Sequence, residues 1–325
     1  MSAQSWLAES FRLWPEELEP LREETRLAVA AWVEQNPARP RAADLQERLR
    51  QERAVNDTMA VGSPHAIERE IAGVPCRVFR PEGRVQAVYL HIHGGGMVMG
   101  SARSDDATNV ARSTRHGIVV VSPEYRLAPE NPFPAGPDDC YAVARWLCEG
   151  GGEELGSDRL LIGGESAGAY MAATTLVRVR DELDAAYRFL GANFIFGIYD
   201  LGGTPSQGGQ RPHGGFDILN PDELEFVRDC FVPDRTTDER RHPSISPLYA
   251  DLHGLPPALF TVGASDHVFD DSVFMASRWS ASGSQAELSA FPDCPHGFII
   301  LPTELGRRGR DRIDTFISDI LNQPG

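Results

Sequence analysis

The pentapeptide Gly-Glu-Ser-Ala-Gly at residues 164–168 places a serine hydroxyl between two glycines. An apolar run at 159–164 leads into it, and a helix-forming run at 167–183 follows it. A G-x-S-x-G motif between a strand and a helix makes a sharp turn that exposes the serine oxygen above the sheet. Ser166 is therefore predicted to be a nucleophile, with the N-terminus of a helix directly behind it.

A second glycine motif, His-Gly-Gly-Gly, begins at His93 after the apolar run 86–92. Glycines leave room for backbone N–H groups to converge on one point, and in hydrolases with this motif they bind the oxyanion of a tetrahedral intermediate. A phosphate-binding loop is disfavoured because the G-x-G-x-x-G and Walker patterns are missing. The predicted oxyanion hole consists of Gly94, Gly95, Gly96 and Ala167.

A serine nucleophile needs a general base and a carboxylate that orients this base. In proteins with the G-x-S-x-G turn, the chain order is Ser, then Asp or Glu, then His. His296 lies in a loop between a predicted strand and the last predicted helix, where such a base should emerge. Asp266 directly follows the predicted strand 258–263, whereas Asp270 and Asp271 are expected in the first turn of a helix. The predicted catalytic residues are Ser166, Asp266 and His296.

His91 and His93 form an H-x-H pair, which can begin a metal site. No further cluster of Asp, His or Cys ligands follows nearby, and the glycine motif already accounts for His93. We therefore expect no metal ion at this pair.

From about residue 65, apolar runs alternate with helix-forming stretches. The first two runs, separated by a turn at Gly73, predict an antiparallel pair, and the later runs predict buried parallel strands. This alternation is typical of an α/β fold, with a mostly parallel sheet of eight strands and helices on both faces. The predicted strands are 66–71, 75–80, 86–92, 117–123, 159–164, 192–199, 258–263 and 286–291. The predicted helices are 103–115, 136–149, 167–183, 268–282 and 304–321.

Residues 1–55 differ from the rest because they are charged and helix-forming and contain no predicted strand. Helical spacing of Leu7, Phe11 and Trp14 predicts a first helix, Pro15 can open a second, and a third is expected at 41–53. We therefore expect an N-terminal helical cap or arm at 1–55, followed by a catalytic domain at 56–325.

The segment 202–247 interrupts the strand–helix alternation. It is rich in Gly, Pro and charge, and it is too long for a simple connection. Its apolar residues favour a folded cap, with a short helix at 221–230, over disorder. Several basic residues of this segment are candidates for binding an acidic substrate group, although a solvated charged face is the commoner arrangement: Arg211, His213, Arg235, Arg240, Arg241 and His242.

The chain carries 31 Lys and Arg against 47 Asp and Glu, a formal net charge of −16. This charge repels nucleic acids and anionic membranes, so neither is an expected partner, and an anionic substrate would need a local basic patch. Five cysteines without a C-x-x-C pair indicate free thiols in a reducing compartment. The N-terminal residues do not resemble a signal peptide, and no apolar run approaches membrane-spanning length. We expect a soluble, cytoplasmic protein.

Five motifs, in this order and spacing, resemble the bacterial hormone-sensitive-lipase-like (family IV) carboxylesterases, from about residue 65 to the C-terminus. They are HGGG (93–96), PEYRLAPENPFPA (123–135), GESAG (164–168), GASDHVFDDS (263–272) and PHGF (295–298). The resemblance implies an α/β-hydrolase fold with a helical cap, hydrolysis of esters with short or medium acyl chains, and no cofactor. It places the nucleophile, acid and base at Ser166, Asp266 and His296, and the oxyanion loop at Gly94–Gly96. Members often dimerise through the last strand, here 286–291.

The sequence departs from this family at Met97, where an aromatic residue is usual, at Ala169-Tyr170, and after Tyr199, where a proline is missing. The residues expected to line the substrate pocket are His93, Met97, Glu165, Tyr170, Tyr199 and Phe216. Alternative functions are amide hydrolysis or deacetylation, a lyase reaction on the same scaffold, or a non-catalytic ligand receptor. The receptor is disfavoured because His296 is retained.

Overall fold

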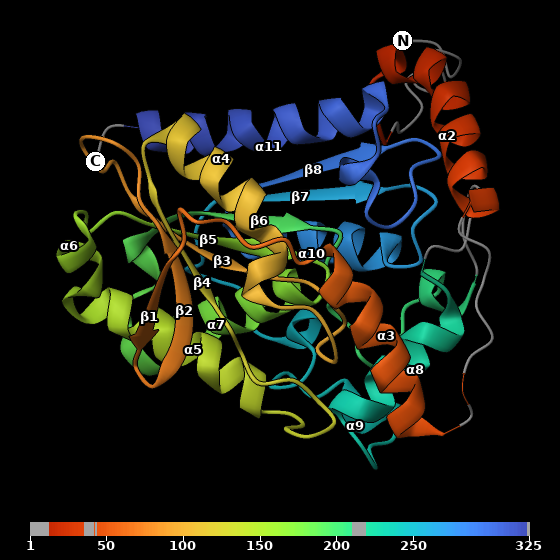
Figure 1. Ribbon diagram of the computed structural model, residues 1–325, viewed down its shortest axis with the longest axis horizontal. Coiled ribbons are helices and arrows are strands. Elements are labelled where there is room, and N and C mark those ends of the chain that lie inside the picture. Colours follow the sequence, from red (N-terminus) through yellow and green to blue (C-terminus); the bar gives the residue numbers. More distant parts are fainter. Residues whose placement is uncertain (1–12, 36–41, 43, 210–218, 324–325) are drawn as a thin grey trace, which may run out of the picture.

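The computed structural model describes residues 13–35, 42, 44–209 and 219–323. Eight strands form one sheet in the order β1-β2-β4-β3-β5-β6-β7-β8 (Figure 1). β1 and β2 pair antiparallel, as do β2 and β4, and all pairs from β4 to β8 are parallel. The predicted α/β class and the mostly parallel eight-stranded sheet are thus confirmed. The strands are β1 (Ile67–Ile71), β2 (Val74–Phe79), β3 (Val88–Ile92), β4 (Val119–Pro123), β5 (Leu160–Glu165), β6 (Phe189–Ile195), β7 (Ala258–Gly263) and β8 (Ala286–Phe291).

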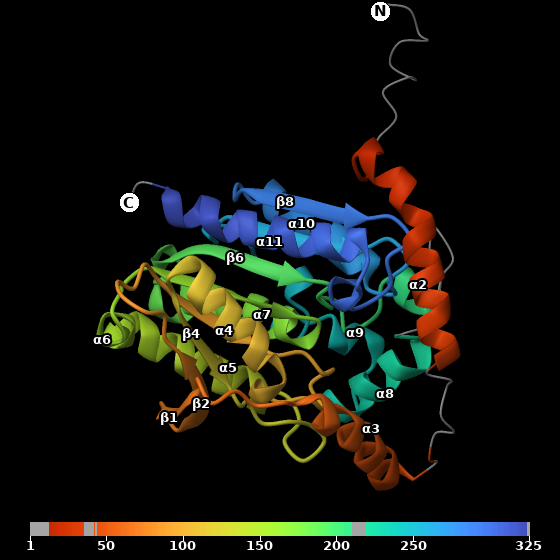
Figure 2. The same ribbon diagram turned by 45° about the horizontal axis from the view of Figure 1, so that its top comes forward.

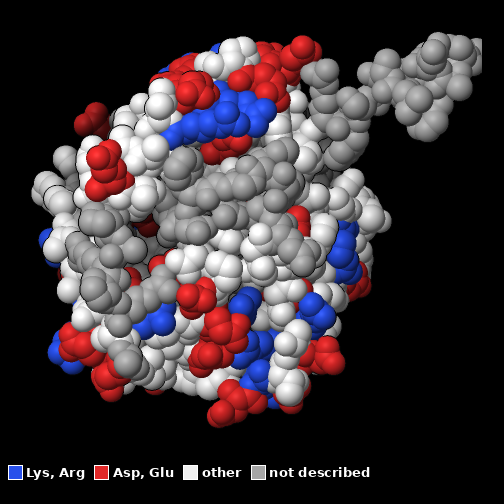
Figure 3. All heavy atoms as spheres, turned by 90° about the vertical axis from the view of Figure 1, so that its right-hand side faces the viewer, with Lys and Arg blue, Asp and Glu red and all other residues white. Residues whose placement is uncertain are grey.

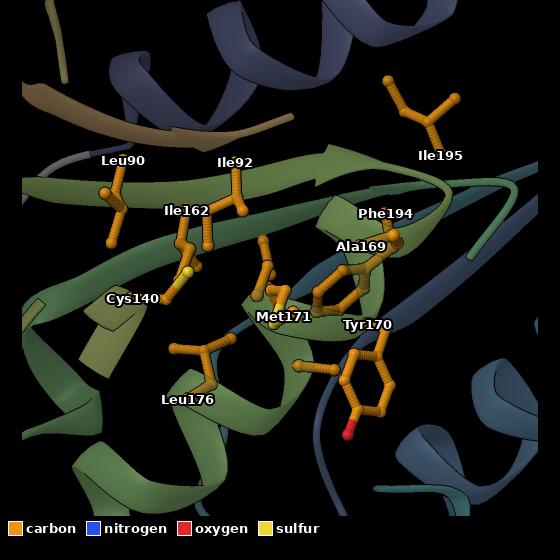
Figure 4. Packing of buried hydrophobic residues seen from close by; sticks show 14 of the residues in the cluster. Leu90, Ile92, Cys140, Ile162, Ala169, Tyr170, Met171, Leu176, Phe194 and Ile195 are labelled. Atoms are coloured by element: carbon orange, nitrogen blue, oxygen red, sulfur yellow. The ribbon is translucent and has the colours of Figure 1, made fainter. Parts of the chain in front are cut away.

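Helices cover both faces of this sheet. α4 (Asp106–His116) and α11 (Glu304–Asn322) pack on one face, while α5 (Ala135–Trp146), α7 (Ala167–Leu183) and α10 (Phe269–Ala281) pack on the other (Figure 1). Every residue of β3, β4 and β7 is buried, as expected for parallel strands with helices above and below. Leu90 and Ile162 from neighbouring strands pack with Leu176 of α7 in this core (Figure 4).

The sixth strand was predicted three residues too late. The expected strand 192–199 is observed at Phe189–Ile195, and the chain leaves the sheet at Phe196, whose φ is 38°. Its remaining apolar residues, among them Ile198 and Tyr199, are buried by other contacts. A buried apolar run therefore marked the core correctly but not the end of the strand.

The N-terminal segment consists of helices where the structure describes it: η1 (Glu16–Leu21), α2 (Arg22–Gln35) and α3 (Leu45–Met59). The predicted first helix lies largely outside the described residues. α3 continues past residue 55, where the catalytic domain was expected to begin. α2, α3, α8 (Pro221–Phe231) and α9 (Thr237–Arg240) lie beyond the ends toward which the strand arrows point (Figures 1 and 2). The short helix predicted at 221–230 corresponds to α8.

All five cysteines are buried and unpaired. Over the described ranges, none of the helices combines the length and apolar character required to cross a bilayer.

Candidate active site

Ser166 stands at the sharp turn between β5 and α7. Its backbone is in an unusual conformation, with φ 55° and ψ −117°, and α7 begins at the next residue. The flanking glycines are required by close backbone approach: a Cβ atom on Gly164 or Gly168 would overlap the carbonyl oxygen of Ile92 at the end of β3. The turn therefore holds the serine hydroxyl above the C-terminal edge of the sheet, as the pentapeptide predicts.

The structure brings Ser166, Asp266 and His296 together. Nε2 of His296 lies 3.0 Å from Oγ of Ser166, and Nδ1 lies 2.8 Å from Oδ2 of Asp266. The Asp266 side chain is fully buried, and its other oxygen accepts a hydrogen bond from the Val268 amide at 3.0 Å. The ring of Phe196 packs edge-on against the imidazole, with 4.7 Å between centroids. In this arrangement the imidazole can accept the proton of the hydroxyl, and the buried carboxylate orients the imidazole.

Backbone hydrogen bonds join the loops that carry the acid and the base. The Ala264 amide donates to the Phe291 carbonyl at 2.8 Å, and the Ser265 amide donates to the Cys294 carbonyl at 3.0 Å. Gly263 lies against the same carbonyl, where a Cβ atom would not fit. The parallel neighbours β7 and β8 therefore end in two connected loops, which fixes Asp266 relative to His296.

The predicted oxyanion residues form a cradle beside Ser166. Gly95 and Gly96 adopt φ values of 109° and 60°, and the Gly95 carbonyl accepts hydrogen bonds from Val98 and Met99. Ala167 is the first residue of α7, so its N–H has no acceptor within the helix. Throughout the described chain, no hydrogen bond is donated by the N–H groups of Gly95, Gly96 or Ala167. Three open donors from the glycine loop and the start of α7 can stabilise a developing negative charge.

The His93 side chain is buried behind the oxyanion loop and contacts its backbone. Its ring stacks on Tyr125 with 4.1 Å between centroids, and its Nδ1 lies 2.7 Å from the Gly94 carbonyl. The Tyr125 hydroxyl donates to the His93 carbonyl at 3.0 Å. Burial lowers the pKa of His93 to about 4, so near pH 7 the ring is neutral and Nδ1–H donates to Gly94. A neutral ring thus orients the Gly94 peptide without adding charge to the cradle.

A cavity of about 1220 Å³ opens at Ser166 and His296. Three of the expected pocket residues line it, His93, Met97 and Glu165, and Phe216 lies outside the described residues. The expectation was wrong for Tyr170 and Tyr199, which are fully buried away from the cavity. Tyr170 lies one helical turn after Ser166 and points into the core, where its hydroxyl donates to the Ile245 carbonyl (Figure 4).

Sequence reasoning missed a polar network behind the nucleophile. Glu165 is bonded to Nε2 of His91 at 2.8 Å, and Nδ1 of the same ring lies 3.1 Å from the Asn109 amide. Arg112 lies 3.7 Å from Glu165. Burial alone would raise the pKa of Glu165, but His91 and Arg112 lower it below its usual value. Burial, with Glu165 nearby, raises the pKa of Asp105 to about 6.

Among the described residues, His91, Asp105 and Glu165 form a group of side chains of the types that bind metal ions. Their possible ligand atoms lie within 4.8 Å of one another. Both ring nitrogens of His91 already have partners, and the Arg112 guanidinium lies beside Glu165. The surroundings therefore fit a balanced charge network better than a cation site.

The cap helix α8 closes the cavity above the oxyanion loop. A Cβ atom on Gly96 would lie 2.8 Å from a methyl group of Val227, and Leu224 and Phe226 also line the cavity.

On the face in Figure 3, basic and acidic side chains are interspersed. Arg240 pairs with Glu225 and Asp229, and Arg241 with Asp200. Arg211 and His213 of the proposed basic cluster lie outside the described residues. The cluster members Arg235, Arg240, Arg241 and His242 are absent from the cavity lining.

Comparison with known proteins identifies the fold and related esterases. Residues 89–300 match a family described as having the α/β-hydrolase fold. The chain is 31% identical over 252 residues to carboxylesterase NlhH of Mycobacterium tuberculosis, covering 74% of this chain and 77% of that protein. A hormone-sensitive lipase from a metagenome library is 28% identical, with a TM-score of 0.77 and coverage of 93% and 98%. A bacterial heroin esterase is 26% identical, with a TM-score of 0.80 and coverage of 93% and 99%.

The fold, the serine turn and these likenesses define the chain as an α/β hydrolase that acts on carboxylic esters. Within that class, it belongs to the hormone-sensitive-lipase-like family IV esterases.

Proposed function

We propose that the protein hydrolyses short- to medium-chain acyl esters of small molecules through an acyl-enzyme at Ser166. The single observation that carries this proposal is the position of His296, within hydrogen-bond distance of both the Ser166 hydroxyl and the Asp266 carboxylate.

In this mechanism, His296 removes the Ser166 proton while Oγ attacks the ester carbonyl carbon. Asp266 accepts a hydrogen bond from Nδ1–H and stabilises the imidazolium that forms. The amides of Gly95, Gly96 and Ala167 bind the oxyanion. His296 then protonates the leaving alcohol, and the carbonyl forms again as the acyl-enzyme.

Water completes the cycle. His296 takes a proton from a water molecule, and the resulting hydroxide attacks the acyl carbon. The second tetrahedral intermediate uses the same oxyanion donors, and its collapse releases the acid and returns the proton to Ser166.

The substrate range is supported by the cavity, because its apolar lining residues, including Ile195, Phe196 and Leu224, can bury an acyl chain.

We further propose that the protein acts in the cytoplasm on small molecules, not on membranes or nucleic acids, and that it dimerises through β8. β8 is the edge strand of the sheet and has an open side for a second copy. Amide hydrolysis and deacetylation use the same machinery and remain the alternative reactions, together with a lyase or a receptor.

The test compares Ser166→Ala with the parent protein on 4-nitrophenyl butyrate and its anilide. We expect Ser166→Ala to lose at least about a thousandfold in kcat/KM, because the nucleophile is removed. A fluorophosphonate should label the parent protein at Ser166. His296→Ala should be similarly impaired. His253→Ala is its matched control, because the His253 side chain is exposed and pairs with Asp251 in its own loop. Near-normal turnover by Ser166→Ala would refute the proposal, and faster turnover of the anilide would favour an amidase.

A further inference from the structure

One face of α3 lines the active-site cavity. Arg48, Glu52 and Asn56 are spaced four residues apart, and all three belong to the cavity lining. The Asn56 amide donates to the Glu52 carbonyl and contacts the sulfur of Met99, which also lines the cavity. The N-terminal segment therefore contributes part of the wall around the substrate.

Arg48 is the notable member of this face. Its guanidinium carbon lies 3.6 Å above the centre of the Phe226 ring on α8. Its Nε and Nη2 atoms are buried, and neither has a hydrogen-bond partner among the residues that the structure describes. The guanidinium group of arginine is a positively charged donor in proteins. Buried N–H donors without an acceptor are unfavourable, so the position is suited to an acceptor that arrives from outside.

The other arginines of the cavity lining are already occupied. Arg112 lies beside Glu165, Arg115 pairs with Asp314, and Arg307 pairs with Glu304 and Asp311. Arg310 donates to backbone carbonyl groups at Ile299 and Leu301. Glu52 also lines the cavity, and it forms no ion pair with Arg48 in the described part of the chain.

The positions of the two open nitrogens also indicate the shape of an acceptor that would fit them. Nε and Nη2 form one edge of the guanidinium plane, and two parallel N–H groups on such an edge match the two oxygens of a carboxylate. Phe226 holds the plane by stacking, and its neighbour Val227 packs on Gly96 of the oxyanion loop. The Arg48 fork and the oxyanion cradle are thus linked by adjacent residues of one cap helix.

We propose that Arg48 is a substrate-binding residue that pairs with a carboxylate, and that the protein is selective for esters carrying a carboxylate away from the scissile bond. This inference rests on the proposed esterase function and names its substrate class. The formal net charge of −16 repels such a substrate in general, so a local cation inside the cavity is what selective binding of an anion requires.

The experiment compares mono-4-nitrophenyl esters of succinate, adipate and suberate with the same esters capped as terminal carboxamides. The parent protein should prefer the charged ester for at least one chain length. Arg48→Gln should lower kcat/KM for that ester by roughly ten- to a hundredfold, as expected for loss of a charged hydrogen-bonded pair, and change the neutral counterpart by less than about twofold. Arg48→Lys keeps the charge but not the two parallel N–H groups. Its kcat/KM for the charged ester should lie between those of the parent protein and Arg48→Gln.

Arg50→Gln is the matched control, because Arg50 is exposed on the same helix and pairs with Glu47. As a readout independent of turnover, monomethyl adipate should raise the melting temperature of Ser166→Ala more than its carboxamide does, and adding Arg48→Gln should abolish this difference. The inference is overturned if the parent protein does not distinguish charged from neutral esters, or if Arg48→Gln lowers both equally. Failure of the esterase proposal looks different, because 4-nitrophenyl butyrate would then be turned over without dependence on Ser166.

Discussion

The loop that carries His296 is anchored to the N-terminal segment by one carboxylate, and removing its charge is expected to slow catalysis. Asp293 lies between the end of β8 and His296, is 5% exposed and adopts φ 53°. Arg22 of α2 reaches it with two hydrogen bonds, at 2.6 and 3.1 Å, and Arg26 pairs with it at 2.8 Å. Burial alone would raise the pKa of Asp293, but the two arginines lower it below its usual value.

Asp293→Asn is the informative substitution, because asparagine tolerates a positive φ and has nearly the same shape. The change therefore removes charge from the anchor with little backbone strain. The Arg22 contact contributes about 1–2 kcal/mol after allowance for partial solvent screening, and the more exposed Arg26 adds less. A base displaced by a fraction of an ångström loses part of its alignment, so we expect kcat to fall about tenfold with KM nearly unchanged.

The assay is steady-state hydrolysis of 4-nitrophenyl butyrate, with thermal unfolding measured on the same samples. Arg22→Gln should reproduce most of the loss, because it removes the larger of the two contacts. The double variant should lose little more than Asp293→Asn, because both substitutions weaken the Arg22–Asp293 contact. Arg145→Gln breaks an exposed pair with Glu149 remote from the loop and should leave kcat unchanged. If Asp293→Asn lowers the melting temperature but keeps the parent kcat at a temperature where it is folded, the anchor does not position His296.

Two further predictions concern the oxyanion loop. Gly96→Ala should lower kcat/KM about a hundredfold, because a Cβ atom would strain a φ of 60° and press on Val227. Gly73→Ala is the control: Gly73 has a φ of 82° in open space between β1 and β2, so the substitution should lower stability but not activity. The contribution of His93 to the free energy of unfolding should decrease by up to about 3 kcal/mol as the pH falls from about 6.5 to 4, because the unfolded chain binds a proton there that folded His93, with its pKa of about 4, does not. His93→Asn should flatten that slope in urea titrations, and an unchanged slope would contradict the assignment.

The parts of the site that the sequence predicted are local motifs or strand ends. The serine turn and the glycine loop are specified by neighbouring residues, and the positions of Asp266 and His296 follow from the rule that parallel strands end at one edge. The errors at Tyr170 and Tyr199 have one cause: closeness in sequence to a site does not fix the direction of a side chain. Tyr170 is one helical turn from Ser166 and faces the core. Asp105 and Arg48 had no periodic or motif signal, since each reaches the cavity through tertiary packing.

Three arginines of the N-terminal segment contact different parts of the site's surroundings. Arg22 holds the loop of the base, and Arg53 donates to the Val98 carbonyl at 2.9 Å and to the Ala128 carbonyl at 3.0 Å, beside the oxyanion loop. Arg48 faces the cavity itself. The charged composition that set residues 1–55 apart in the sequence thus has a structural explanation. These arginines reach loops beside the site, and loops offer carbonyls and carboxylates, which arginine binds well through its five donors.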